Sequence, residues 1–182
     1  MVDMLYNFDL KILFLVNQTL SNPVFDFIMP LFDNTKKWLP FILLFWLLLS
    51  YLDKKNRRKI LILIPLVIIF GDLLGKSIKS LELRDRPWFS LGESINHLGG
   101  KGGRHYSFPS NHALNITSIA YILSSIYTNY YKYFWAYASV VIFSRVYIGV
   151  HYPLDVFTGA SIGFLVGMGC YKLYERVSRS LF

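Results

Sequence analysis

The chain has 182 residues, of which 54% are hydrophobic, 18% aromatic and only 16% charged. A soluble domain of this length usually carries about a quarter charged residues, so the composition indicates a single domain embedded in a membrane. The net charge of +8 does not indicate nucleic-acid binding, because many basic residues gather in short runs beside apolar segments, as membrane topology requires.

The N-terminal 35 residues contain two short apolar stretches. Leu5–Leu20 has apolar residues on a helical period that is broken by Asp9 and Asn17, and Val24–Phe32 follows after a polar turn. Neither stretch is a continuous run of about 20 apolar residues, which a spanning helix needs. We therefore expect residues 1–35 to form two helices lying at the membrane surface. The alternative is a single broken span.

Five further apolar segments predict transmembrane helices: Trp38–Leu52, Ile60–Ile78, Ala113–Tyr127, Phe134–Val150 and Val156–Tyr171. One long polar loop, residues 80–109, lies between the second and third segments. The sequence thus predicts an all-α, polytopic membrane helix bundle with about five transmembrane helices, preceded by interfacial helices. We expect one domain over residues 1–182, with its transmembrane core over residues 36–182.

Two features inside the apolar segments call for partners. Asp72 lies within the second segment, and a carboxylate at membrane depth usually pairs with another group; we expect a structural partner such as Lys76. The last segment carries several glycines, including Gly159 and Gly163 four residues apart. Small residues at this spacing let two helices approach closely in lipid, so we expect them to serve packing.

The basic residues predict the orientation. Three basic stretches fall on one side of a five-span protein: Lys54–Lys59, Lys132 and Lys172–Arg179. The positive-inside rule makes that side cytoplasmic, and the 80–109 loop then faces outward. Three cations of this loop, Arg84, Lys101 and Arg104, oppose the assignment unless they bind substrate.

Three polar clusters lie at the edges of apolar segments: Lys79 with Arg86-Pro87, Pro109-Ser110-Asn111-His112, and Ser144-Arg145 with His151 and Asp155. Together they supply the groups that phosphoryl transfer through a histidine needs. Cations neutralise the phosphate charge, one imidazole attacks, a carboxylate orients it, and a second imidazole handles the leaving-group proton. Ser110 precedes an apolar helix, so it is a candidate N-cap beside free N–H groups that suit an anion.

The order and spacing of these clusters resemble the three signature motifs of the type 2 phosphatidic acid phosphatase superfamily, which also contains vanadium haloperoxidases. The resemblance covers residues 79–155. One departure is Asn111, which stands where the family usually has glycine. Asparagine tolerates a left-handed backbone better than most residues, so the turn can survive this change.

The resemblance implies a role for each motif residue. It implies that His151 attacks phosphorus to give a phosphohistidine, that Asp155 holds and polarises His151, and that His112 protonates the departing oxygen and later activates water. It also implies a set of substrate-binding residues: Lys79, Arg86, Ser110, Asn111 and Arg145. His97 and His105 match no motif and are expected to be solvated loop residues.

No metal or other cofactor is expected, because the sequence has no metal-binding motif and the cations occupy the place that a metal would take. The resemblance implies a metal-independent lipid phosphatase at the outer face of a bacterial inner membrane, similar to small lipid A phosphatases and phosphatidylglycerophosphate phosphatases. Its partners would be the bilayer and a lipid substrate, and its oligomeric state stays open.

Several substrates and functions stay open. The substrate candidates are lipid A phosphate, undecaprenyl pyrophosphate, phosphatidylglycerophosphate and phosphatidic acid, with lipid A slightly favoured because a small, open site suits a bulky glycolipid. A lipid phosphotransferase is the nearest alternative function. A vanadate-dependent haloperoxidase is less favoured because of the apolar spans, and a non-catalytic lipid transporter would need no nucleophile.

Overall fold

The computed structural model describes residues 2–100 and 103–181, and most of these residues lie in helices. Its α-helices are α1 (Val2–Phe14), α2 (Pro23–Ile28), α3 (Thr35–Leu52), α4 (Arg57–Lys79), α5 (Pro87–Ser90), α6 (Asn111–Ile126), α7 (Tyr131–Tyr147) and α8 (Pro153–Leu181). A π-helical turn extends α1 over Leu15–Thr19, and 3-10 turns cover Met29–Phe32, Gly92–Ser94 and Thr128–Tyr130. In this part of the chain, β-pairing is limited to an isolated bridge between Arg84 and Tyr106. The predicted all-α class is confirmed.

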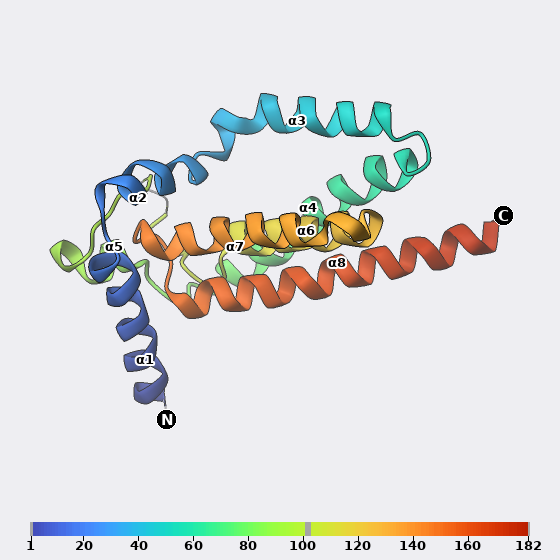
Figure 1. Cartoon of the computed structure of the whole chain (residues 1–182). Coiled ribbons are helices and arrows are strands. Elements are labelled where there is room, and N and C mark those ends of the chain that lie inside the picture. Colours follow the sequence, from blue (N-terminus) through green and yellow to red (C-terminus); the bar gives the residue numbers. More distant parts are fainter. Residues whose placement is uncertain (1, 101–102, 182) are drawn as a thin grey trace.

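The five long helices α3, α4, α6, α7 and α8 run back and forth between two ends of the molecule (Figure 1). At one end, here called the loop end, the chain between α4 and α6 lies beside the start of α3, where Gly100 N donates to Asp33 Oδ2. The other end, here called the basic end, holds the Asp53–Lys59 turn. There, Tyr127 Oη donates to Asp53 Oδ2 at 2.8 Å, and Lys59 Nζ lies 2.5 Å from Glu175 Oε1.

Three of these helices, α3, α4 and α8, are long and apolar enough to cross a membrane. Helices α6 and α7 have 16 and 17 residues, so each is about 24–26 Å long, somewhat less than the ~30 Å of a hydrocarbon core. The α1–α2 pair would supply a fourth span if it crosses as one bent unit. The five predicted helices are thus present, while the count of five spans stays a prediction.

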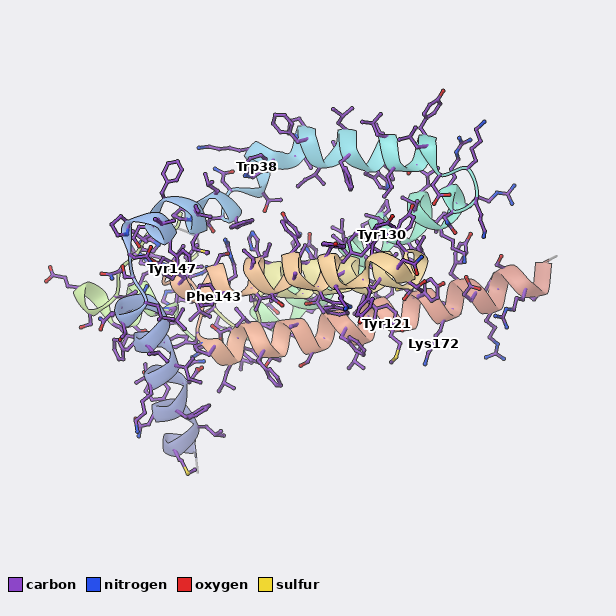
Figure 2. The ribbon with its side chains drawn as sticks, in the orientation of Figure 1. Trp38, Tyr121, Tyr130, Phe143, Tyr147 and Lys172 are labelled. Carbon is purple, nitrogen blue, oxygen red and sulfur yellow. The ribbon has the colours of Figure 1, made fainter. Side chains whose placement is uncertain are left out.

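Helix α3 presents large apolar side chains to the surroundings. Trp38, Phe41 and Phe45 are 45%, 64% and 61% exposed, and Figure 2 shows side chains projecting from α3 away from the rest of the bundle. Water-soluble proteins rarely expose a continuous apolar surface of this extent. The surface is suited to lipid, as expected of a membrane protein.

The N-terminal segment lies across the loop end. The α1 unit and the α2 unit meet at a bend of 98°, and α1 runs steeply across the direction of α6, α7 and α8 (Figure 1). The side chain of Asn17 fastens this segment to the loop end, donating to the carbonyls of Asn96 at 2.9 Å and Tyr147 at 2.7 Å. The two expected helices are present, and their placement at the membrane surface stays a prediction, because the bent pair is also apolar enough to be one broken span.

Helix α8 packs closely on α6. A Cβ at Gly159 would collide with the carbonyl of Ser110, and one at Gly163 would collide with the backbone of Leu114. The Ser118 hydroxyl also donates to the carbonyl of Gly163 at 2.9 Å. The predicted packing role of these glycines is confirmed, and this contact sets the start of α6 against the start of α8.

Candidate active site

His151 lies in the short loop between α7 and α8. Gly149 bends this loop with a φ of +73°, a left-handed conformation that glycine adopts without strain. The backbone N–H of His151 donates to the carbonyl of Arg145 at 3.2 Å. Pro153 then begins α8, which suits a residue with no N–H to donate. This hydrogen bond holds two predicted motif residues together beside the first turn of α8: Arg145 near the end of α7 and His151 in the loop.

Asp155 follows in that first turn and faces His151. Its Oδ2 lies 3.6 Å from His151 Nδ1, a distance longer than an ordinary hydrogen bond. The same oxygen accepts from Ser107 Oγ at 2.6 Å and from the backbone N–H of Tyr152 at 2.9 Å. Asp155 is fully buried and His151 is 3% exposed. The carboxylate is thus fixed in the orientation that supports the imidazole.

The surroundings keep His151 neutral. Burial lowers its pKa to about 3, and the positive charges of Arg86 and Lys79 act in the same direction, while Asp155 opposes them. A neutral imidazole has the free lone pair that nucleophilic attack requires. Arg86 binds the carbonyl of Val150, which directly precedes His151. Lys79 binds the carbonyl of Ser107, whose hydroxyl binds Asp155.

Backbone carbonyls hold two of the predicted cations. Lys79 Nζ donates to the carbonyl of Tyr106 at 2.7 Å. Arg86 donates through Nε to Gly103 at 2.9 Å and through Nη1 to Val150 at 3.3 Å, and burial lowers the pKa of Arg86. Since these partners are uncharged, both side chains keep their positive charge available to an anion.

The third cation, Arg145, is already bound to a carboxylate that sequence analysis missed. The side chain is fully buried, and Nη1 donates to Asp33 Oδ1 at 2.7 Å. Asp33 Oδ2 in turn accepts from the backbone N–H of Gly100 at 2.5 Å. Asp33 lies just before α3, far from the motifs in sequence, and no local pattern marks it.

The N-terminus of α6 brings His112 to the site. Ser110 is the N-cap, with its Oγ accepting from Ala113 N at 3.4 Å, as predicted. The backbone N–H of Ser110 donates to the carbonyl of Asp155 at 3.0 Å, which ties the α6 start to α8. His112 Nε2 lies 3.1 Å from Thr35 Oγ1, so the start of α3 also reaches the site.

Asn111 differs from expectation in two ways. The left-handed backbone expected at Asn111 is wrong, because Asn111 begins helix α6. Among the described residues other than glycine, only Glu82 has a positive φ. The side chain of Asn111 lies against Gly75 and donates to Asp72 Oδ1 at 3.3 Å. Any contribution of Asn111 to phosphate binding would therefore come from its backbone.

Asp72 also differs from expectation. Its partners are the side-chain amides of Asn111 and Asn115, the latter at 3.0 Å, so the expected pairing with Lys76 is wrong. Both asparagines lie on α6, whereas Lys76 is exposed on α4. The carboxylate therefore joins two helices rather than two turns of one helix.

The loop histidines have separate roles. His105 is exposed and its Nδ1 lies 2.7 Å from Asp85 Oδ1, as a solvated residue would. His97 is half-buried and stacks on Trp88 at a ring separation of 5.1 Å, so the expectation of solvation is wrong for it. Lys101, a cation considered for substrate binding, lies outside the described residues.

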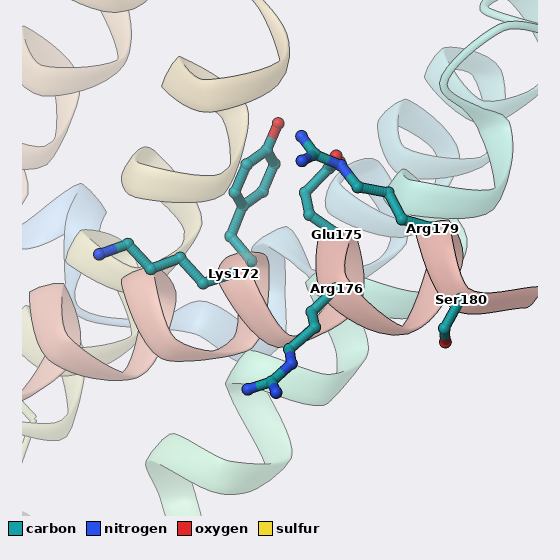
Figure 3. A pocket seen from close by; sticks show the side chains of 6 residues that line it. Lys172, Glu175, Arg176, Arg179 and Ser180 are labelled. Carbon is teal, nitrogen blue, oxygen red and sulfur yellow. The ribbon is translucent and has the colours of Figure 1, made fainter.

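A pocket of about 560 Å³ lies away from these groups, on the last turns of α8. Figure 3 shows the basic residues that line it, Lys172, Arg176 and Arg179, together with Glu175. These residues belong to the basic end, whereas His151 and Asp155 belong to the loop end. The pocket is therefore separate from the candidate active site.

The fold and the site together define a class of protein. The fold is a helical bundle with lipid-suited surfaces, and its loop end gathers a neutral histidine, an aspartate, a second histidine and three cations. These groups fit phosphoryl transfer, and the class is a multi-pass membrane phosphatase.

The comparisons with known proteins identify the family. The family model described as the PAP2 superfamily matches residues 60–179, and the chain belongs to this superfamily. It is 31% identical over 170 residues to the lipid A 4'-phosphatase of Porphyromonas gingivalis, which covers 89% of this chain and 71% of that relative. The resemblance stated from the three motifs is confirmed, and the protein is an integral-membrane lipid phosphatase.

Two crystal structures share the fold. One is Aquifex aeolicus LpxE, with a TM-score of 0.72 and 28% identity, covering 90% of this chain and 94% of that one. The other is a PAP2-type phosphatidylglycerolphosphate phosphatase from Bacillus subtilis, with a TM-score of 0.70 and 25% identity, covering 96% of this chain and 88% of that one.

Proposed function

We propose that the protein hydrolyses a phosphate from a lipid head group through a phosphohistidine on His151. In the first step, His151 Nε2 forms a bond to phosphorus and the P–O bond to the lipid breaks. His112, which the negative charge of the bound phosphate holds protonated, gives its proton to the departing oxygen. In the second step, His112 takes a proton from water as the water oxygen attacks phosphorus and the P–N bond breaks. Both imidazoles then return to their starting states.

One observation carries this proposal. The Nδ1 atom of His151 faces Asp155 at 3.6 Å inside a buried cluster. With its proton on Nδ1, directed at the carboxylate, the imidazole has its lone pair on Nε2, where attack requires it. The carboxylate also stabilises the positive charge that the ring gains on attack.

The cations would hold the three equatorial oxygens of the phosphate. Lys79 and Arg86 keep their charge next to His151, and Arg145 joins them once it leaves Asp33. Ser110 would add its hydroxyl proton, and the N–H of Asn111 contributes at the positive end of α6. Donors of this kind commonly contribute about 3–4 kcal/mol each to stabilising the transition state.

We infer that the substrate is a phosphorylated glycolipid of the lipid A kind. The P. gingivalis relative is a lipid A 4'-phosphatase, and it matches 89% of this chain. The likeness to the B. subtilis phosphatidylglycerolphosphate phosphatase keeps that lipid as the second candidate. Undecaprenyl pyrophosphate and phosphatidic acid remain in the test panel.

The whole chain, residues 1–182, is proposed to act as one phosphatase domain in a bacterial inner membrane, with the site facing the periplasm. Asp33 and Thr35 support the inclusion of the N-terminal 35 residues, because both contact motif side chains. The charge distribution supports the orientation, because the Lys54–Lys59 turn lies at the end opposite the site.

Phosphate release from purified lipids tests the function. The wild-type protein should release phosphate from lipid A faster than from the other three lipids, and His151→Ala should release none. His112→Ala should retain a trace of phosphohistidine formation with an activated phosphate ester, because such a leaving group needs no proton.

Transfer of phosphate to a sugar hydroxyl instead of water would favour the phosphotransferase alternative. Normal turnover by His151→Ala would exclude the mechanism.

Chelation tests the role of the cations. Because Lys79, Arg86 and Arg145 supply the positive charge, excess EDTA should leave the rate of phosphate release unchanged. Vanadate should inhibit, since its trigonal-bipyramidal form imitates the transition state. Loss of activity with EDTA that is restored by added magnesium would contradict the proposal.

A further inference from the structure

Arg84 lies between two buried carboxylates. Its Nη1 is 2.6 Å from Asp9 Oδ2 and 3.3 Å from Asp155 Oδ1, and both aspartates are fully buried. The guanidinium also covers the ring of Tyr152, with its Cζ 3.5 Å from the ring centroid. Buried charges of one sign are costly unless an opposite charge lies between them, and Arg84 supplies that charge.

Asp9 makes a second connection to the same region. Its Oδ1 accepts from the backbone N–H of Leu154 at 2.8 Å, in the first turn of α8. One carboxylate of α1 therefore binds both the arginine next to Asp155 and the helix that carries Asp155. Asp9, which interrupts the apolar pattern of α1, therefore has a partner at each of its two carboxylate oxygens.

The contacts of Asp155 divide between its two oxygens. Ser107 and the N–H of Tyr152 bind Oδ2, the oxygen that faces His151, whereas Arg84 binds Oδ1. This division fixes the rotation of the carboxylate about its own axis. Asp9 draws part of the charge of Arg84 away, so Asp155 stays negative enough to polarise the imidazole.

We propose that Asp9 and Arg84 are positioning residues for the catalytic carboxylate, so that helix α1 takes part in the reaction. This proposal rests on the proposed roles of His151 and Asp155. The three charges, two negative and one positive, leave one net negative charge in the cluster, and that charge serves His151. Neither Asp9 nor Arg84 needs to touch the substrate.

The proposal predicts a distinctive set of kinetic effects. Arg84→Gln should leave the two buried carboxylates to repel each other without a cation between them and should free Asp155 Oδ1. Asp155 then no longer keeps its orientation toward His151, and kcat should fall by about 100-fold. Asp9→Asn should lower kcat by about tenfold, because Arg84 then neutralises Asp155 alone. The KM and the vanadate inhibition constant should stay within about twofold, since the phosphate clamp is unchanged.

The double variant is the decisive measurement. Asp9→Asn with Arg84→Gln leaves Asp155 as the only carboxylate of the cluster, still held by Ser107 and Tyr152, so its kcat should be higher than that of Arg84→Gln alone. A purely structural role predicts additive losses instead. Additive losses, or a raised KM with unchanged kcat, would overturn the proposal.

Two controls complete the design. Lys11→Gln removes an exposed charge from α1 and should keep the wild-type kcat. If Arg84→Gln does not fold, Arg84→Lys keeps the charge and loses the fixed geometry, and its kcat should still fall; a wild-type kcat would overturn the proposal. The proposed function is judged separately, by phosphate release from the wild-type protein and its loss in His151→Ala.

Discussion

At the scale of single residues, the site depends on the burial of its ionisable side chains. His151 is almost fully buried, and its pKa is about 3 for that reason. A nucleophilic imidazole must be unprotonated when the phosphate arrives. The loop between α7 and α8 achieves this by burial, with no need for a basic pH.

This burial predicts a pH dependence of stability. Below pH ~6.5 the His151 imidazole of the unfolded chain takes up a proton, whereas the folded protein resists protonation until about pH 3. Between these values the unfolded state binds more protons, so stability falls as the pH falls, by up to about 1.4 kcal/mol per pH unit. Thermal unfolding in detergent at pH 7 and pH 5 should therefore show a smaller loss for His151→Gln than for the wild type. Equal losses would contradict this reading.

The hydrogen bond between Arg145 and Asp33 predicts a second effect of a single residue, on the binding of anions. Phosphate and Asp33 compete for Arg145 Nη1, so Asp33→Asn should free the arginine for anions. Charge-assisted hydrogen bonds contribute about 1.5–3 kcal/mol, and the vanadate inhibition constant should fall by about tenfold. Glu93→Gln removes an exposed charge from the same end of the molecule and should leave inhibition unchanged. Weaker inhibition of Asp33→Asn would show that Asp33 instead holds Arg145 in its working position.

At the scale of helices, the contact between α6 and α8 determines the distance between the two catalytic histidines. His112 lies in the first turn of α6, and His151 immediately precedes α8. The hydrogen bond from Ser110 N to the carbonyl of Asp155 joins the two helix starts. Gly159 and Gly163 on α8 allow this approach, because a Cβ at either position would collide with the backbone of Ser110 or Leu114.

A matched pair of glycine substitutions tests this contact. Gly163→Ala should cost about 1–3 kcal/mol of stability through overpacking, because its Cβ would collide with the backbone of Leu114. Gly169→Ala should be neutral or slightly stabilising, since nothing lies within 4 Å of a Cβ at that position. Thermal unfolding of both variants, together with phosphate release, measures the effect. Equal behaviour of the two variants would exclude a specific role for the close contact.

At the scale of the whole molecule, the catalytic groups lie at the end opposite to the basic Lys54–Lys59 turn and the basic last turns of α8. Helix α8 has 29 residues and is about 44 Å long, so it extends beyond a hydrocarbon core of ~30 Å. The excess length carries Lys172, Arg176 and Arg179, which continue the positive charge of the Lys54–Lys59 turn. This gathering of positive charge at one end favours a cytoplasmic location for the basic end.

Cysteine labelling tests the orientation in a Cys170→Ala background. Ser94→Cys lies on the loop end and Lys55→Cys on the basic end, and both positions are exposed. An impermeant maleimide should label Ser94→Cys in intact spheroplasts and Lys55→Cys only after lysis. The reverse result would place the site in the cytoplasm and favour newly made phospholipids as substrates.

The sequence alone determined the helical class, the long helices and the three motif clusters. These features are local: apolar periodicity reflects burial or lipid exposure along one helix, and the motif spacing follows from chemistry within short segments. Ser110 as an N-cap and Pro153 as the start of α8 were predictable for the same reason, since each acts on its own helix end.

Only the tertiary structure decided which distant groups meet. Asp33 and Thr35 reach Arg145 and His112 because α3 begins at the loop end, and Asp9 reaches Arg84 because α1 crosses that end. Asp72 pairs with Asn111 and Asn115 across two helices, rather than with Lys76 on its own helix. Each pairing depends on side chains more than 35 residues apart, and no local pattern records how the helices pack or which charges burial forces together.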